Sequence, residues 1–301
     1  MTPKTFLQGL LDAQNLSQQQ DKDLQSHKSE VTNFLRAEFG QDPVIKYAGS
    51  YEKGTMISDR YDLDIVCYFP SSDERSLKEI REDVSTRLSK KYILTHKASA
   101  ERILDLKGTD APVDFHIDVV PGRFIMNTKD VFLHVAQGDK ERMQTNLKTH
   151  IDHIANSGCV PVIRLVKLWA NRNNIHIKTF ILELFVVEAL SGSGTKDNLE
   201  LSFLKVMEAF KDKFGNIELV DPANPTGNVV SRTITSSEKL VVAQAGENAF
   251  KQLVGSDNLS DWKTIFGETN VISTDSISSN SSSSGFTPQP PWCTDYADRV
   301  R

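Results

Sequence analysis

Residues 49–69 read GSYEKGTMISDRYDLDIVCYF, and this stretch decides the fold. It opens with Gly49 and Ser50 in a glycine turn, where backbone N–H groups can approach a phosphate closely. It ends with Asp62 and Asp64 at the start of an apolar run, which predicts a strand. Aspartates two residues apart on a strand share one face and can bind one hard divalent cation. The stretch therefore predicts a phosphate-binding turn beside a metal-binding pair of carboxylates.

A third carboxylate is expected from residues 113–122, which read VDFHIDVVPG. The alternation predicts a strand with apolar residues on one face and Asp114, His116 and Asp118 on the other. If this strand neighbours the first, three acids converge, and either Asp114 or Asp118 could be the third. Two metal ions about 3.5–4 Å apart could then clamp the attacking and leaving oxygens of an in-line displacement. We expect His116 to make a structural hydrogen bond.

Hydrophobic periodicity predicts an α/β first half and a helical second half. Two helices are expected within residues 1–40. Pro121-Gly122 is expected to end the α/β part. The elements expected after the first two helices are strands at 44–48, 62–69, 91–99, 100–106 and 113–119, and helices at 76–92, 140–156, 159–172, 179–191, 199–213 and 236–254.

The composition changes abruptly near the C-terminus. From residue 273 the chain is rich in serine and proline, and such a segment buries too little apolar surface to offset its ordering entropy. We therefore predict three parts: a catalytic core with the N-terminal helices at 1–139, a helical lobe at 140–272, and a flexible tail at 273–301.

These motifs resemble those of a known group of enzymes. The set Gly49-Ser50, Gly54-Thr55, Asp62-x-Asp64 and Asp118 is similar to the core of the polymerase-beta-like nucleotidyltransferases. The second half resembles the 2′-5′ oligoadenylate synthetases in three segments that follow in the same order, at residues 164–169, 181–184 and 221–229. Together these features resemble a bacterial cGAS/DncV-like nucleotidyltransferase (CD-NTase) of the CBASS antiphage systems, with a mixed sheet and a C-terminal helical lobe.

The resemblance implies a metal-dependent enzyme that makes cyclic di- or trinucleotide second messengers from nucleoside triphosphates, ATP among them. It implies that Asp62, Asp64 and Asp118 are catalytic and hold two Mg²⁺ or Mn²⁺ ions. Asp118 is chosen as the third acid because it directly precedes Val119-Val120-Pro121, as in similar enzymes. Asp114 is then a solvated or supporting residue.

The same resemblance implies four nucleotide-binding positions: Gly49, Ser50, Lys167 and Phe180. Gly49 and Ser50 would hold phosphates, and Lys167 would contact the donor triphosphate. Phe180 stands where related enzymes carry a base-stacking tyrosine. Simpler alternatives exist for two of them, because Lys167 could snorkel from an amphipathic helix and Phe180 could belong to the core.

Other conspicuous residues are expected to be structural. We expect Lys53 to be a solvated turn residue and Arg164 to form a salt bridge. Trp169 is expected in the core. Asp221 and Asn224 are expected to shape turns in the sequence Asp-Pro-Ala-Asn-Pro.

The composition of the chain argues against several classes of function and location. The 301-residue chain has a net charge of −5, which argues against constitutive nucleic-acid binding. It has no apolar run of about 18 residues, so no membrane span is expected. Its three cysteines are far apart, which favours neither zinc nor disulfides and suggests the cytoplasm.

The sequence is also compatible with two other functions, and it suggests a docking role for the tail. The catalytic core would also suit an enzyme that makes linear oligonucleotides or adds single nucleotides. A non-catalytic nucleotide-binding protein of the same fold is the third possibility. The tail presents Trp292 and Tyr296 beyond its serine-rich spacer, which suggests docking to an accessory regulatory protein.

Overall fold

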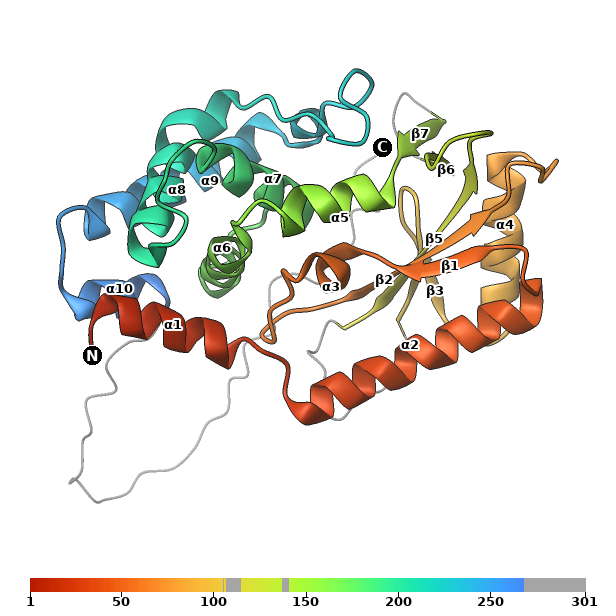
Figure 1. Ribbon diagram of the computed structural model, residues 1–301, viewed down its shortest axis with the longest axis horizontal. Coiled ribbons are helices and arrows are strands. Elements are labelled where there is room, and N and C mark those ends of the chain that lie inside the picture. Colours follow the sequence, from red (N-terminus) through yellow and green to blue (C-terminus); the bar gives the residue numbers. More distant parts are fainter. Residues whose placement is uncertain (105, 107–114, 137–140, 268–301) are drawn as a thin grey trace, which may run out of the picture. The chain divides into compact units, whose positions relative to one another are not determined.

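A seven-stranded mixed sheet (Figure 1) carries two of the predicted acids, Asp64 and Asp118. This computed structural model describes residues 1–104, 106, 115–136 and 141–267. The strand order is β1-β2-β5-β4-β3, and β6 pairs with both β5 and β7. The strands β2 and β5 are parallel, whereas the other pairs are antiparallel. The strands are β1 (Val44–Tyr47), β2 (Leu63–Phe69), β3 (Leu94–His96), β4 (Glu101–Ile103), β5 (Ile117–Phe124), β6 (Val131–His134) and β7 (Arg142–Thr145).

Ten α-helices accompany the sheet within the described residues, and two 3₁₀ turns follow α8. The helices are α1 (Pro3–Ala13), α2 (Gln18–Phe39), α3 (Gly49–Lys53), α4 (Leu77–Leu88), α5 (Leu147–Ala155), α6 (Val160–Arg172), α7 (Thr179–Ala189), α8 (Leu199–Lys213), α9 (Ser236–Leu253) and α10 (Leu259–Ile265). Among the described residues, no helix combines the length and apolar character needed to cross a bilayer.

The helices α2 and α4 cover one face of the sheet. Both begin with a capping box, in which the cap serine and the residue three positions on satisfy each other's backbone N–H groups. Their apolar stripes pack on the inward residues of β2 and β5, which alternate with the outward ones. The core residues of this face include Leu24, Val31, Leu35, Leu63, Ile65, Cys67, Ile80, Val84, Ile117 and Val119. The opposite face is therefore the one that carries Asp64 and Asp118.

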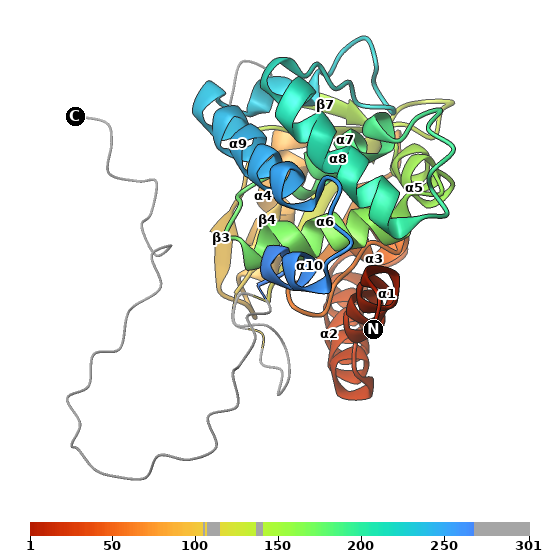
Figure 2. The same ribbon diagram turned by 90° about the vertical axis from the view of Figure 1, so that its left-hand side faces the viewer.

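The second half of the chain forms a helical core around Trp169. This side chain is 2% exposed and stacks on Phe210, as expected for a core residue. The first helix belongs to the same core, because α1 contacts α6, α8 and α10 (Figure 2). The N-terminal segment thus joins both halves: α1 packs on the C-terminal helices and α2 on the sheet. The predicted mixed α/β fold with a helical C-terminal region is confirmed.

Two predictions about the middle of the chain were wrong. Pro121-Gly122 does not end the α/β part, because β5 continues to Phe124 and is followed by β6 and β7. On this side of β5, the pairing with β4 ends at Val119 and the pairing with β6 begins at Arg123. Pro121 lies between the two, so its missing N–H is tolerated. Gly122 lets β6 approach, since a Cβ there would lie 2.6 Å from Val131 Cγ1.

The strand β7 also replaces the start of the helix expected at 140–156. Residues 142–145 pair with β6 along their whole length, and α5 begins only at Leu147. Pairing with a neighbouring strand has overridden the local helix preference of Arg-Met-Gln. The predicted domain boundary at residue 139 lies outside the described residues, as do Asp114 and the tail from residue 273. Residues Met1–Glu268 form a single compact unit.

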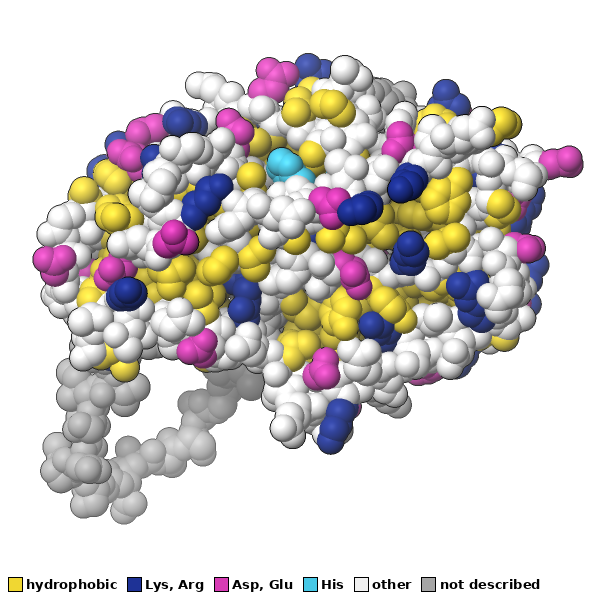
Figure 3. Space-filling model, in the orientation of Figure 1, with side chains coloured by type: hydrophobic (Ala, Val, Ile, Leu, Met, Phe, Trp, Pro, Cys, Tyr) yellow, Lys and Arg dark blue, Asp and Glu magenta, His cyan; other side chains and the backbone are white. Residues whose placement is uncertain are grey.

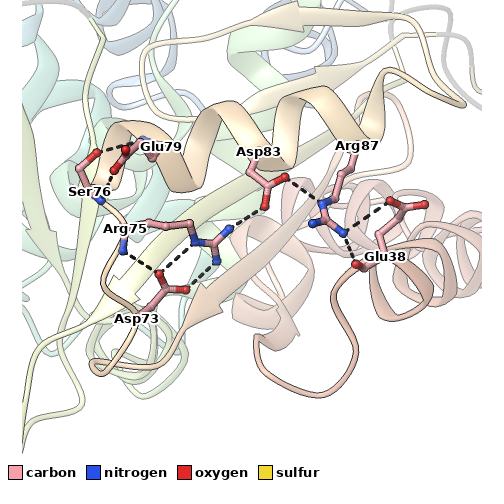
Figure 4. A network of polar contacts seen from close by, with 7 residues as sticks. All are labelled: Glu38, Asp73, Arg75, Ser76, Glu79, Asp83 and Arg87. Carbon is pink, nitrogen blue, oxygen red and sulfur yellow. Dashed lines mark hydrogen bonds and ion pairs between the residues drawn. The ribbon is translucent and has the colours of Figure 1, made fainter.

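A network of charges fixes the end of β2 that lies away from the acids (Figure 4). The Arg75 guanidinium donates two hydrogen bonds to Asp73, at 3.0 and 2.6 Å, and a third to Asp83. Arg87 joins Asp83 to Glu38 at the end of α2. The loop after β2 is thereby tied to both α4 and α2, which holds the strand in place between them.

Candidate active site

The glycine turn and the first acids touch each other. The short helix α3 begins at Gly49, whose φ of +64° lies in the left-handed region. A Cβ at this position would lie 1.7 Å from Asp64 Oδ2. The Asp64 carboxylate therefore packs directly on the Gly49 backbone, and only glycine leaves room for it.

Strand register brings the three predicted acids together at the N-terminal ends of the inner strands β2 and β5. Asp64 on β2 stands directly beside Asp118 on the parallel strand β5. Asp62 immediately precedes β2 and is half-exposed. His116 lies between the acids, with Nε2 3.4 Å from Asp62 Oδ2 and 3.9 Å from Asp118 Oδ2. Its position next to the acids gives this imidazole an electrostatic role as well as a structural one.

The pKa values of Asp62 and Asp64 are shifted in opposite directions. Burial raises the pKa of Asp64 to about 7, and the charges of Asp62 and Asp118 add to the rise. Burial also acts on Asp62, but hydrogen bonding and attraction to His116 outweigh it and lower the pKa of Asp62. A cluster that raises the pKa of one member in this way favours the binding of a cation.

Arg102 on β4 binds the third acid. Its Nε and Nη2 donate to Asp118 Oδ1 and Oδ2, both at 2.8 Å. Arg102 and Asp118 are direct cross-strand neighbours. Within the described parts of the chain, no group of three or more histidine, cysteine, aspartate or glutamate side chains is placed to hold a metal ion. Asp118 is thus brought to the site but faces a guanidinium.

Beneath the turn lies a buried charge network centred on Glu183. This side chain has no exposed surface, forms an ion pair with Lys53, and accepts from Thr55 Oγ1 at 2.5 Å. Lys167 Nζ donates to the Thr55 carbonyl at 2.8 Å and lies 3.9 Å from Glu183 Oε1. The prediction that Lys53 is solvated was wrong, because Lys53 is 7% exposed and holds the turn to α7.

A pocket of about 120 Å³ opens beside Asp62, between the acidic cluster and helices α6 and α7, and Asp62 is the member of the cluster that lines it. Ser50, Asp62, His116 and Lys167 line it, and residues 170–182 supply its other wall. Burial lowers the pKa of Lys167, although the charge of Glu183 opposes this effect. Polar groups from elements far apart in sequence converge here, as expected for a binding site.

Phe180 lies next to this region rather than among the pocket residues. Its ring centroid is 4.7 Å from that of His150 and 5.4 Å from Lys53 Nζ. His150 Nε2 lies 2.6 Å from Asp221 Oδ1, and Asp221 also accepts from Asn228 Nδ2 at 3.0 Å. The Asp-Pro-Ala-Asn-Pro segment is therefore connected to Phe180 through the His150 side chain.

A larger hollow of about 710 Å³ lies elsewhere, between β1 and α5. Figure 3 shows hydrophobic side chains gathered on this face, with basic side chains among them. Tyr47, Tyr68, Phe124 and Leu147 line the hollow, and the three catalytic candidates are not among its lining residues. The candidate site is therefore assigned to the smaller pocket, because polar side chains converge there, and not to the hollow with the larger volume.

The structure thus brings Gly49, Ser50, Asp62, Asp64, Asp118 and Lys167 into one neighbourhood. Sequence reasoning missed Arg102 and Glu183. Arg102 follows the strand alternation that also places Ile103 in the opposite core, so its face could have been predicted. Glu183 is the one charge in an apolar run from Ile181 to Val187, and such a charge requires a partner. Arg164 contacts the backbone carbonyls of Met56 and Leu11 rather than the expected acid.

Comparisons with known proteins identify the family and the fold. Residues 1–157 match the model of the Second Messenger Oligonucleotide or Dinucleotide Synthetase domain. A search of curated proteins finds no match. Among solved structures, CdnC of Escherichia coli MS115-1 with ATP superposes with a TM-score of 0.68 at 20% identity, covering 89% of this chain and 98% of that one.

Two further structures have the same fold. CdnG of Bradyrhizobium diazoefficiens, in complex with GTP, gives a TM-score of 0.70 at 12% identity and covers 87% of this chain and 94% of that one. The Vibrio cholerae cyclic AMP-GMP synthase DncV gives 0.61 at 15% identity, with coverages of 81% and 76%. The chain belongs to the family of second messenger oligonucleotide or dinucleotide synthetases, and it is a nucleotidyltransferase with the CD-NTase fold.

Proposed function

We propose that this enzyme uses divalent metal ions to join nucleoside triphosphates into cyclic di- or trinucleotides that serve as second messengers in antiphage defence. One observation carries the proposal. Asp64 and Asp118 stand side by side on β2 and β5, with Asp62 and the Gly49-Ser50 turn against them. This arrangement places carboxylates next to a turn that can hold phosphates.

The donor set fits a hard divalent cation. Carboxylate oxygens are the ligands that Mg²⁺ prefers, and Mg²⁺ needs only one or two of them when substrate phosphates complete its shell. Asp62 and Asp64 would hold the first ion, and Asp118 would contribute to the second. When bound, Mg²⁺ or Mn²⁺ supplies charge neutralisation at the phosphates and a lowered pKa at the acceptor hydroxyl.

The protein's own groups position the substrates. Ser50 and the backbone of residues 49–55 would hold the β- and γ-phosphates of the donor. Lys167 lines the same pocket and would add a positive charge near the triphosphate, while keeping Thr55 in place. Phe180 would offer a ring face to a base. Positioning and electrostatics suffice for such a transfer, so no covalent intermediate is required.

The substrates and partners follow from the solved relatives. Structures with ATP and with GTP support nucleoside triphosphates as substrates, ATP among them. CdnC has been solved in complex with HORMA-deltaN, which supports regulation of this enzyme by an accessory protein. Trp292 and Tyr296 of the tail would serve as anchors for such a partner. The reaction would take place in the cytoplasm without bound nucleic acid.

Product analysis tests the proposal. The full chain is incubated with all four nucleoside triphosphates and Mg²⁺ or Mn²⁺, and products are identified by mass spectrometry before and after phosphatase treatment. Cyclic products resist the phosphatase because they carry no terminal phosphate. Linear products would overturn the cyclisation step, and unchanged nucleotides would overturn catalysis itself.

A matched inactive variant makes the result specific. Asp62→Asn with Asp64→Asn should abolish the product and leave the circular dichroism spectrum unchanged. The melting temperature should change little, because removing the unfavourable charge of Asp64, whose pKa is raised, offsets the loss of the attraction between Asp62 and His116. A collapsed spectrum would instead assign the two acids to the structure.

A further inference from the structure

The contact between Arg102 and Asp118 is the feature of the site that the proposed reaction does not explain. One guanidinium binds both oxygens of the third acid, each at 2.8 Å. The two side chains are 25% and 15% exposed, so solvent weakens the pair only partly. Bidentate arginine–carboxylate pairs of this kind are among the strong charged contacts in proteins.

The backbone that carries Arg102 is held firmly from the opposite face of β4. Glu101 is 1% exposed and accepts from Arg81 Nε at 2.7 Å. Arg81 also donates to the carbonyl of Ala98 at 2.7 Å, which anchors the β3–β4 turn to α4. A change at the Arg102–Asp118 contact therefore requires only a rotation of the Arg102 side chain, while β4 stays in place.

The neighbouring positive charges are already engaged. Lys53 and Lys167 bind Glu183 and the Thr55 carbonyl beneath the turn. His116 Nε2 lies 3.9 Å from Asp118, farther than either nitrogen of Arg102. Arg102 is thus the group that neutralises Asp118 in this structure, and a divalent cation at Asp118 would have to stand next to a guanidinium. Like charges at that distance repel, so the two cations exclude each other.

We propose that Arg102 is a positioning residue that keeps Asp118 from divalent cations until substrate is bound. Asp62 and Asp64 then bind one ion without nucleotide, and the second site forms when Arg102 leaves Asp118. A bound triphosphate both carries a cation and offers the guanidinium another anionic partner. This inference rests on the proposed function, because it assumes that Asp118 serves a second metal ion.

Mn²⁺ binding to the nucleotide-free full chain tests the inference, with electron paramagnetic resonance as the readout. Wild type should bind about one ion per chain, and Arg102→Ala about two. The affinity at the added site should exceed any wild-type binding there by about tenfold or more. Adding Asp118→Asn to Arg102→Ala should remove the gain. An Arg102→Ala variant that binds Mn²⁺ as wild type does, with an unchanged melting temperature, overturns the inference.

Arg75→Ala is the matched control. Arg75 also binds an aspartate through Nε and Nη2, at 3.0 and 2.6 Å from Asp73, but lies at the other end of β2. Its removal should leave Mn²⁺ binding unchanged. A gain of similar size in this variant would show that freeing any aspartate suffices, and would overturn the assignment to Arg102.

A single substitution covers the case in which Arg102→Ala does not fold. Asp118→Asn in the wild-type background should leave nucleotide-free Mn²⁺ binding unchanged, because in the wild type Arg102 already keeps Asp118 from cations when no nucleotide is bound. The same variant should still reduce product formation, because it lacks the third acid. Weaker nucleotide-free binding in Asp118→Asn overturns the inference. Failure of the proposed function is distinguishable, since wild type would then form no product whatever Arg102 does.

Discussion

Gly49 illustrates how a single residue sets the geometry of this site. Its positive φ begins α3, and its missing side chain lets the Asp64 carboxylate rest on the backbone. Gly54 ends the same helix with a φ of +70°, but the nearest atom to a Cβ there is Val160 Cγ1 at 4.0 Å. The two glycines share a backbone conformation and differ in what a side chain would meet.

This difference predicts the outcome of a pair of substitutions. Gly54→Ala should cost about 1–2 kcal/mol of stability from its left-handed backbone and change activity little. Gly49→Ala carries the same strain and also displaces the Asp64 carboxylate, so product formation should fall about a hundredfold. Urea unfolding and initial rates measure the two effects. Equal loss of activity in both variants would mean that helix α3, rather than the Asp64 contact, matters.

At the level of elements, α7 and the glycine turn depend on one another through Glu183. The apolar run that builds α7 places this carboxylate where water cannot reach it, and Lys53 and Thr55 supply its partners. Helix α6 adds Lys167 to the same group. The glycine turn is therefore held from below by two helices of the second half.

Removing Glu183 should loosen this connection. Glu183→Gln leaves Lys53 buried without its ion-pair partner, and breaking a buried pair in this way costs about 3–5 kcal/mol. Glu188→Gln on the exposed side of α7 is the control and should change stability by less than about 0.5 kcal/mol. The free energy of unfolding in urea checks both. A Glu183→Gln variant as stable as the control would show that the pair contributes no net stability.

The contact between α5 and the Asp-Pro-Ala-Asn-Pro segment predicts a dependence on pH. Burial acts to raise the pKa of Asp221, but the hydrogen bond and charge of His150 outweigh it and lower that pKa. An aspartate with a lowered pKa stabilises the fold above its unfolded pKa of about 3.9, and this contribution is lost as pH falls through the folded value.

Asp221→Asn removes that contribution. The stability difference between wild type and this variant should be present near pH 5 and should shrink as the pH falls below about 3.9. Urea unfolding of both proteins across this range measures the difference. A difference that stays constant down to the acid limit would assign the role of Asp221 to its neutral hydrogen bonds alone.

The whole molecule joins its two halves at the place where the chemistry is expected. Arg164 on α6 donates to the Met56 carbonyl at 3.1 Å, and Arg172 lies 3.2 Å from Asp59. Both contacts reach the segment between the glycine turn and the first acids. Among the described residues, the hydrophobic cluster around Trp169 extends from Phe6 to Phe266, so it joins the start of the chain to the last described helix, before the serine-rich segment.

A chain that ends at residue 272 should therefore fold and react as the full chain does. Its melting temperature should agree with that of the full chain within about 2 °C, and its basal product yield should be unchanged. Binding of an accessory protein through Trp292 and Tyr296 should be lost. An inactive shortened enzyme would show that the tail contributes to catalysis, and the docking role would be abandoned.

The sequence by itself determined much of the fold and singled out the candidate acids. Alternation assigned Asp64 and Asp118 each to the polar face of its own strand, because the two-residue period of a strand depends on local geometry alone. That the two strands are neighbours was only a condition in the sequence argument, and the pairing of β2 with β5 meets it. The apolar stripes of α2, α4 and α6 could be recognised for the same reason, since the helical period is also local. The resemblance added the order of motifs in the second half.

Only the tertiary structure decided which side chains face those acids. The pairing of β4 with β5 brings Arg102 to Asp118, and the packing of α7 under the turn brings Glu183 to Lys53. The strand β7 likewise exists because β6 offers it a partner, although its residues favour a helix. The two side-chain contacts join residues 16 and 130 positions apart, and no local pattern specifies which partner a buried charge or an unpaired strand will find.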